Sequence, residues 1–466
     1  MKSVSELLNA ARKAQEQING YSQEQIDEVC LSIGWEVYND YNIDILARMA
    51  VEETGYGNYG SKIVKHKRKI GGVLHDIRNA KSVGCIERDP ASGISKYAKP
   101  VGVVCAILPA TNPTATCGGK ALSVLKGRNA VIFKASSRAR KCTEAAVGMM
   151  RRGLERVGAP LDLIQIMELP GREAAAELMA GCDLIVATGS GPLVKAAYSS
   201  GTPAFGVGAG NAVAIIAEDA DIADAARKIH ASKTFDNATS CSSENAVIVL
   251  DAVREAVLEA FRALRAHICT PDEAKKLKAH MWRPNKKGTL ALNEDVIAKS
   301  AMVIAEGAGL AVPPDTTMIL VESGDAPALD QFAEEKISPV LSMYRAKDFA
   351  EAAHTLRILT SRVGPGHSCG IHTFKRDYIE HLGETMPTSR VTVRQPMAAA
   401  NGGHPCNRMP STATLGCGTW GGNVTTENIH YKHFLNITWV NEPVEPWSFT
   451  DESMWGDFRK KYPDTL

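Results

Sequence analysis

The sequence of 466 residues predicts an α/β protein with two doubly wound domains and a small additional β-sheet. Short apolar segments alternate with helical segments from residue 101 onward, and a second series of the same kind follows residue 251. Two further strand-like segments fit neither series. A chain of this length exceeds one ordinary hydrophobic core, so two domains of about 150–250 residues are expected.

The first 56 residues are expected to be helical. Within residues 22–40, apolar side chains recur at helical spacing, at Ile26, Val29, Ile33 and Val37. Gly55 and Gly57 then end the helical pattern.

The first α/β series carries six short segments that are apolar on both faces. They are residues 101–108, 130–135, 162–167, 183–189, 212–217 and 246–251. Helices are expected between them at 140–158 and at 219–233, the latter with Asp219 as its N-cap. Strands of this kind, separated by helices, indicate a mainly parallel sheet covered on both sides.

The second series repeats this organisation. Helices are expected at 251–267, 273–281, 294–308 and 347–360, and strands at 317–322, 370–374 and 389–395.

The two remaining segments are 84–100 and 433–443. The first predicts a β-hairpin that turns at Asp89-Pro90 and Ser92-Gly93, and the second predicts a single strand. We expect the two segments to pair in a projecting sheet. An exposed sheet edge of that kind is usually buried by another subunit, so a homodimer or homotetramer is expected.

Composition excludes several classes of function. The net charge of +1 argues against a nucleic-acid partner. No segment approaches the roughly 20 consecutive apolar residues that span a membrane, and the first residues lack the apolar core of a signal peptide. A cytoplasmic protein is expected. The eleven cysteines show no CxxC pair and no zinc-ligand spacing, so we expect no metal site.

Two polar turns are candidates for catalytic chemistry. Cys241 lies in a polar turn directly before an apolar strand, which suits a nucleophilic thiol at an element end. Asn112 follows the strand 101–108, where ligands bind in parallel sheets, and its amide is placed to donate to an oxyanion. A structural cysteine and an ordinary turn asparagine are the alternatives.

Glycine-rich turns suggest a nucleotide, although no GxGxxG motif follows a strand. The segments ATGSGPLVKAAY (187–198) and FGVGAGN (205–211) allow close approach of the backbone to a ligand.

Seven segments in order make the chain resemble the aldehyde dehydrogenase superfamily, and most closely its coenzyme A (CoA)-acylating branch. They are PVGVVCAILPATNPT, GRNAVIFKAS, ATGSGPLVKAAYSSGTPAFGVGAGN, SKTFDNATSCSSENAVIV, EEKISPVLSMYRAKDF, GHSCGIHT and TLGCGTWGGN. The resemblance covers residues 5–445.

The resemblance implies three structural parts. Residues 1–83 and 101–208 would form a dinucleotide-binding domain, and residues 209–432 a catalytic domain that carries Cys241. Residues 84–100 and 433–443 would form the oligomerisation strands.

The resemblance also implies roles for individual residues. Cys241 would be the nucleophile, Asn112 the oxyanion donor and His367 an aid to proton transfer, with a structural histidine as the alternative. Dinucleotide contacts are implied for Lys134, Ser136, Ser137, Arg138, Gly189, Ser190 and Glu335. The basic turn at Arg138 slightly favours NADP over NAD. The alternative is that the basic residues of this turn are solvated surface charges.

The hydrolytic members of the family use a glutamate that this chain lacks. Gly206 occupies its position, and no Asp or Glu lies in residues 201–217. Water needs a base, whereas a thiol with a pKa of about 8.5 needs far less help. CoA is therefore the expected acyl acceptor. A hydrolytic enzyme and an inactive structural protein are the rival hypotheses.

Arginines near the C-terminus suggest an anionic aldehyde. Arg390, Arg394 and Arg408 lie in the segment expected at the substrate end of the site, and a guanidinium pairs well with a sulfonate or carboxylate. Sulfoacetaldehyde is the first expectation, succinate semialdehyde the second, and acetaldehyde a further alternative. Contacts with CoA phosphates or a surface position are the other roles open to these arginines.

Overall fold

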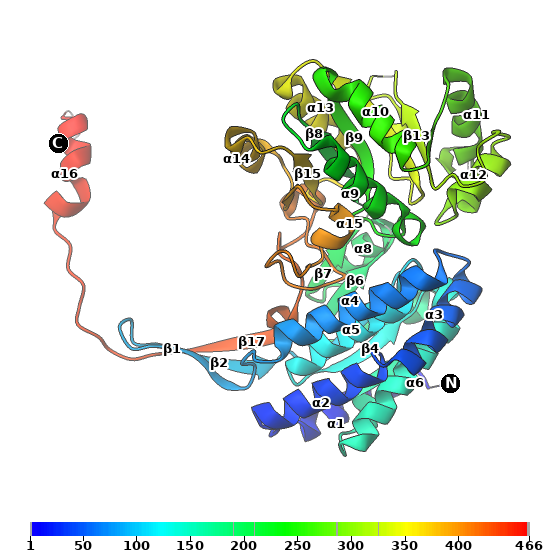
Figure 1. Cartoon of the computed structure of the whole chain (residues 1–466). Helices are drawn as coiled ribbons and strands as arrows, with labels where there is room; N and C mark the ends of the chain where they lie inside the picture. Colours follow the sequence, from blue (N-terminus) through cyan, green and yellow to red (C-terminus); the bar gives the residue numbers. More distant parts are fainter. Residues whose placement is uncertain (1, 190, 209, 286–287, 325, 464–466) are drawn as a thin grey trace.

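The computed structural model describes residues 2–189, 191–208, 210–285, 288–324 and 326–463 (Figure 1). The predicted α/β architecture is confirmed: two separate parallel sheets carry helices, and a third, antiparallel sheet projects from the body.

The first sheet is parallel throughout and has five strands in the order β5-β4-β3-β6-β7. Its strands are β3 (Val103–Ile107), β4 (Ala130–Lys134), β5 (Ile164–Ile166), β6 (Leu184–Thr188) and β7 (Ala204–Val207). Strand β3 is buried at every position, as expected for the centre of a sheet that is covered on both faces.

In the described part of this half, eight helices surround the sheet. They are α1 (Val4–Gln17), α2 (Gln23–Glu36), α3 (Asp40–Thr54), α4 (Tyr59–Ile77), α5 (Pro113–Lys126), α6 (Arg140–Arg156), α7 (Arg172–Gly181) and α8 (Gly191–Tyr198). Gly55 ends α3 in the left-handed conformation, as the sequence predicts, and Asn58 caps α4 by accepting from the Ser61 amide.

The second sheet is also parallel and has seven strands in the order β10-β13-β14-β9-β8-β15-β16. Its strands are β8 (Ala212–Ile216), β9 (Glu244–Leu250), β10 (Ala266–Ile268), β13 (Met318–Glu322), β14 (Val340–Ala346), β15 (Cys369–His372) and β16 (Val391–Val393). Separate apolar clusters pack against its two faces.

The helices of this half are α9 (Ile222–Thr234), α10 (Arg254–Ala263), α11 (Pro271–Met281), α12 (Ala301–Gly307), α13 (Phe349–Arg362), α14 (Arg376–Thr385) and the short α15 (Met397–Ala400). The strands β11 (Trp282–Pro284) and β12 (Leu290–Leu292) form a separate hairpin.

Several details differ from the sequence prediction. The strands expected at 212–217 and 246–251 in the first series are β8 and β9 of the second sheet. The helix expected at 251–267 ends at Ala263, and Ala266–Ile268 form β10. Asp221, not Asp219, caps α9, because the Asp219 carboxylate instead accepts from the Thr373 hydroxyl and the Phe374 amide. The helix expected at 294–308 is interrupted, since Ala298 has a φ of 57° and a new helix starts after it.

The projecting antiparallel sheet has the order β1-β2-β17, and this confirms the pairing of the two stray segments. Its strands are β1 (Gly84–Asp89), β2 (Ile94–Pro100) and β17 (Leu435–Asn441). Beyond β17 an extended segment leads to α16 (Asp451–Lys461), which stands apart from the body (Figure 1). The domain boundaries stay a prediction, because sheet order does not define where an independent unit ends. In the part of the chain described, no helix combines the length and apolarity needed to cross a membrane.

Candidate active site

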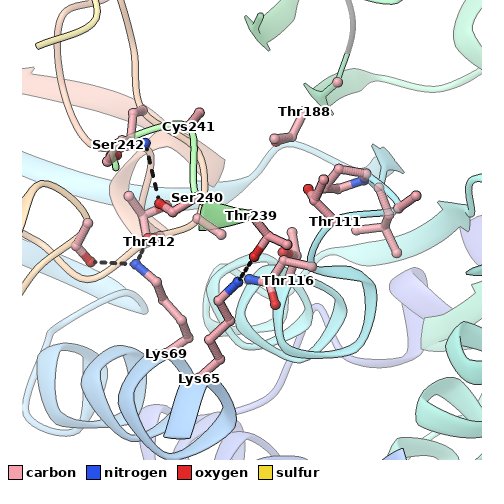
Figure 2. A pocket seen from close by; sticks show the side chains of 18 of the residues that line it. Lys65, Lys69, Thr111, Thr116, Thr188, Thr239, Ser240, Cys241, Ser242 and Thr412 are labelled. Carbon is pink, nitrogen blue, oxygen red and sulfur yellow. Dashed lines mark hydrogen bonds between the residues drawn. The ribbon is translucent and has the colours of Figure 1, made fainter. Parts of the chain in front are cut away.

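A cavity of about 640 Å³ lies where strand ends of the first sheet meet the loop before β9 (Figure 2). Polar turns at the carboxyl ends of β3, β4 and β6 form one side of it. Six of the residues predicted from the sequence line this cavity: Asn112, Lys134, Ser136, Gly189, Cys241 and Glu335.

Cys241 is half-buried in the loop between α9 and β9 and contacts His367. The Nε2 atom of His367 lies 3.3 Å from the Cys241 Sγ atom. His367 itself is completely buried, just before β15, although it does not line the cavity. The structure therefore brings together the thiol and the histidine that are 126 residues apart in the sequence.

A chain of hydrogen bonds orients the His367 ring. Its Nδ1 atom lies 2.8 Å from the Ser368 Oγ atom, which also accepts from the Asn401 side-chain amide at 3.0 Å. The Thr392 hydroxyl donates to the Asn401 side-chain oxygen at 2.6 Å. Burial, followed by the nearby Arg390 charge, lowers the pKa of His367 to about 3, so the ring is neutral near pH 7.

The cavity raises the pKa of the Cys241 thiol to about 11. Burial is the main cause, and the carboxylate of Glu335 adds to it. A hydrogen bond from Ser242 and the charges of Lys69 and Arg390 act in the opposite direction. The thiol is therefore protonated at rest, and the Nε2 atom of the neutral His367 ring lies within reach of its proton.

Asn112 immediately precedes α5 but does not cap it. Its side chain makes no hydrogen bond to the helix, whose first residue is Pro113 and so has no amide N–H to offer. Asn112 lines the same cavity as Cys241. An amide that is not used in capping and belongs to a residue lining the cavity of the thiol suits an oxyanion donor.

Only some of the residues predicted to hold a dinucleotide lie around the cavity. Lys134, Ser136, Gly189 and Glu335 line the cavity, whereas Ser137 and Arg138 are exposed and do not. The Arg138 guanidinium instead pairs with the carboxylate of Glu294. Ser190 lies outside the described residues.

The three arginines expected at the substrate end are not among the residues that line the cavity, and their contact with a substrate stays a prediction. Arg390 is buried and donates to the Asn428 side chain and to the main-chain oxygens of His367, Gly416 and Thr426.

The other two arginines lie elsewhere. Arg394 donates to the Thr373 carbonyl at 2.5 Å and stacks over the Phe374 ring, and Arg408 is exposed.

Sequence reasoning missed the cations that do face the cavity. Lys65, Arg68 and Lys69 of α4 line it, and Figure 2 shows Lys65 and Lys69 rising from the helix towards the loop of Cys241. The Lys69 ammonium donates to the carbonyls of Thr412 at 2.8 Å and Gly402 at 3.2 Å. The basic run at 62–69 was the available signal.

Acidic groups are scarce in the cavity. Among the described residues that line it, Glu335 is the only acid, and its Oε1 atom accepts from the Gly210 amide at 3.3 Å. Gly206 sits within β7, where an added Cβ would lie 2.8 Å from the Val194 side chain and 2.9 Å from that of Tyr198. The fold therefore offers little room for a side chain at that position.

Comparisons with known proteins agree with this geometry. The aldehyde dehydrogenase family model matches residues 1–405. The chain is 67% identical to the acylating sulfoacetaldehyde dehydrogenase of Bilophila wadsworthia, over 99% of this chain and 100% of the relative. It is 37% identical to the acetylating succinate-semialdehyde dehydrogenase of Clostridium kluyveri, over 97% and 99%.

A solved structure is also similar. An acetylating aldehyde dehydrogenase from Geobacillus thermoglucosidasius superposes with a TM-score of 0.91 at 36% identity, covering 96% of this chain and 98% of that protein. Family model, relatives and fold agree over nearly the whole length: the chain belongs to the aldehyde dehydrogenase family.

Proposed function

We propose that the protein oxidises a small anionic aldehyde to its CoA thioester, with sulfoacetaldehyde as the first candidate substrate. The contact between the Cys241 thiol and the neutral His367 ring, at a cavity that Asn112 also lines, is the observation that carries this proposal. The anionic substrate class is inferred from the similarity to a sulfoacetaldehyde dehydrogenase and a succinate-semialdehyde dehydrogenase.

The first step is addition of the Cys241 sulfur to the aldehyde carbon. His367 takes the thiol proton on Nε2, and the carbonyl π bond opens to an oxyanion as the S–C bond forms. The Asn112 amide donates to that oxygen, and one such donor is worth about 3 kcal/mol in the transition state.

A nicotinamide dinucleotide fits the same cavity. The side chains of Lys134 and Glu335 and the bare backbone at Gly189 and Gly208 line the space beyond Cys241. When bound, the dinucleotide supplies the hydride acceptor that turns the adduct into an acyl thioester. The slight preference for NADP came from the basic turn at Arg138, and the pairing of Arg138 with Glu294 adds no support to it.

Release of the acyl group favours a thiol over water. A CoA thiolate adds to the acyl carbon, and the C–S bond to Cys241 breaks, which returns the enzyme thiolate. Hydrolysis would need a base, and Glu335 is the only acid among the described lining residues. That acid already accepts from the Gly210 amide, which supports thiolysis.

The cations of α4 are the proposed partners of the sulfonate. Lys69 uses two of its three N–H donors on carbonyls, so one donor and its charge remain for a ligand. Arg68 lines the same cavity, and the buried hydroxyl of Thr116, another lining residue, has no partner among the described residues. A carboxylate would use the same groups, which keeps succinate semialdehyde as the alternative.

A substrate panel tests the proposal. Sulfoacetaldehyde, succinate semialdehyde and acetaldehyde are each mixed with NADP or NAD, with and without CoA, and absorbance at about 340 nm follows the reduced cofactor. We expect turnover with sulfoacetaldehyde that requires CoA. Turnover independent of CoA would favour a hydrolytic enzyme, and no turnover with any aldehyde would refute the proposal.

Lys69→Met should raise KM for sulfoacetaldehyde about tenfold or more, and leave KM for acetaldehyde within about twofold.

A further inference from the structure

We propose that Lys62 is a positioning residue that ties the Asn112 turn to the loop of Cys241 and so fixes the gap between amide and thiol. The inference rests on the proposed function, since the roles of Asn112 and Cys241 come from it.

One buried ammonium group joins the two turns directly. The Lys62 Nζ atom donates to the Thr111 carbonyl at 2.9 Å and to the Asp236 carboxylate at 2.8 Å. Thr111 immediately precedes Asn112, and Asp236 lies five residues before Cys241. The Lys62 and Asp236 side chains are 2% and 0% exposed, so water does not compete for these bonds.

Asp236 is held from several sides. Its carboxylate also accepts from the Lys65 ammonium at 2.5 Å, the Thr239 hydroxyl at 2.7 Å and the Asn58 amide at 2.9 Å. Lys65 in turn donates to Thr239, the contact visible in Figure 2. A buried charge with this many partners fixes the backbone that carries it.

The backbone that Asp236 anchors is strained. Asp236, Asn237 and Ala238 have φ angles of 52°, 52° and 59°, a succession of three left-handed residues without a glycine. Such a conformation persists only where its surroundings over-determine it. These three residues turn the chain from α9 into the loop that ends at Cys241.

On the other side, the backbone at Gly57 packs closely against the Asp236 carboxylate. A Cβ on Gly57 would lie 1.9 Å from the Asp236 Oδ1 atom, so only glycine fits at this position. The Gly57 amide and the Asn237 side chain both donate to the Ala298 carbonyl at 3.0 Å. The turn is therefore tied to the start of α4 on one side and to the segment before α12 on the other.

This geometry makes Lys62 matter for rate more than for binding. Oxyanion stabilisation depends on donors that already stand where the negative charge develops. A shift of about 1 Å in a reacting group can cost about 100-fold in rate. Lys62 touches neither reacting group, but it bonds to both of the turns that carry them.

A double-mutant cycle tests the proposal. Lys62→Met, which keeps length and loses the ammonium, should lower kcat about 30-fold or more with KM for the aldehyde within about threefold. In an Asn112→Ala background the same change should cost less than about threefold, because the amide it positions is absent. Full additivity of the two losses, or no loss of kcat, would overturn the proposal.

Lys126→Met is the matched control for general destabilisation. Lys126 is also a fully buried lysine paired with an aspartate, Asp27, but it lies at the far end of α5. It should lower the thermal midpoint as Lys62→Met does and leave kcat within about twofold. An equal loss of kcat in both variants would mean that Lys62 is merely structural.

Amide hydrogen exchange separates this inference from the proposed function. Lys62→Met should speed exchange about fivefold or more in both segments 109–114 and 236–242, and Lys126→Met in neither. If the wild type turns over no aldehyde but this pattern appears, the function fails and the link stands. If turnover is normal and exchange changes in neither segment, the proposed role of Lys62 is refuted and the proposed function stands.

Discussion

At the scale of single residues, the environment of Cys241 sets how its reactivity depends on pH. Burial and Glu335 raise the thiol pKa to about 11, while the imidazole of His367, with a pKa near 3, stays neutral throughout the working range. Below pH 11 the thiolate fraction therefore grows about tenfold for each pH unit.

Alkylation of the free enzyme measures this dependence. Between pH 7 and 9 the rate of Cys241 alkylation, read by peptide mass spectrometry, should rise about 100-fold without an inflection. The exposed Cys406 serves as an internal reference in the same digest. A plateau of the Cys241 rate already near pH 8 would mean that the resting site stabilises the thiolate.

Single residues also mark the limit of sequence reasoning. Asn112 follows one apolar strand and Cys241 lies in a polar turn directly before another, so their positions are readable from the pattern. Arg390 carries the same charge as a substrate-binding arginine, yet its guanidinium is bonded to main-chain oxygens from distant segments. Nothing local distinguishes the two roles, because the partners are assembled only by the fold.

At the scale of elements, the strained turn 236–238 makes a testable contribution to stability. Ala238 has a φ of 59°, a conformation that costs an L-residue with a Cβ about 1 kcal/mol and glycine almost nothing. Ala238→Gly should therefore raise the midpoint of thermal unfolding by about 1–3 °C. Ala10→Gly, inside α1, is the control and should lower it. A lower midpoint for Ala238→Gly would contradict the assignment of strain.

The helix α4 shows why some elements escaped prediction. Its buried face includes Lys62, Lys65 and His66, polar residues that do not register as an apolar stripe. Those lysines are buried only because Asp236, far along the chain, meets them. The short strands β7 and β10 escaped for a different reason: segments of three or four residues carry too little periodicity to identify.

At the scale of the whole molecule, the projecting sheet is the proposed contact between subunits. The strand β17 is an edge strand whose side chains stay exposed, with Ile437 at 37% and Trp439 at 57%. An apolar edge of this kind is normally covered by another chain. The pairing of β17 with β2 was predictable from two strand-like segments without partners, whereas the number of subunits was not.

Light scattering during gel filtration tests the contact. The double substitution Ile437→Glu and Trp439→Glu should convert the oligomer to monomers, because charges on the edge oppose strand pairing. Trp35→Glu is the matched control, since Trp35 is 58% exposed on α2, away from this sheet. An unchanged mass for the double variant, or monomers for the wild type, would exclude this sheet as the interface.

The central claim is that the acyl group rests on the sulfur of residue 241 until a second thiol removes it. The most direct measurement is the mass of the Cys241 peptide after the enzyme meets sulfoacetaldehyde and oxidised cofactor without CoA. We expect a sulfoacetyl adduct on that peptide that disappears when CoA is added. An unmodified peptide, an adduct on another residue, or an adduct lost equally fast without CoA would contradict it.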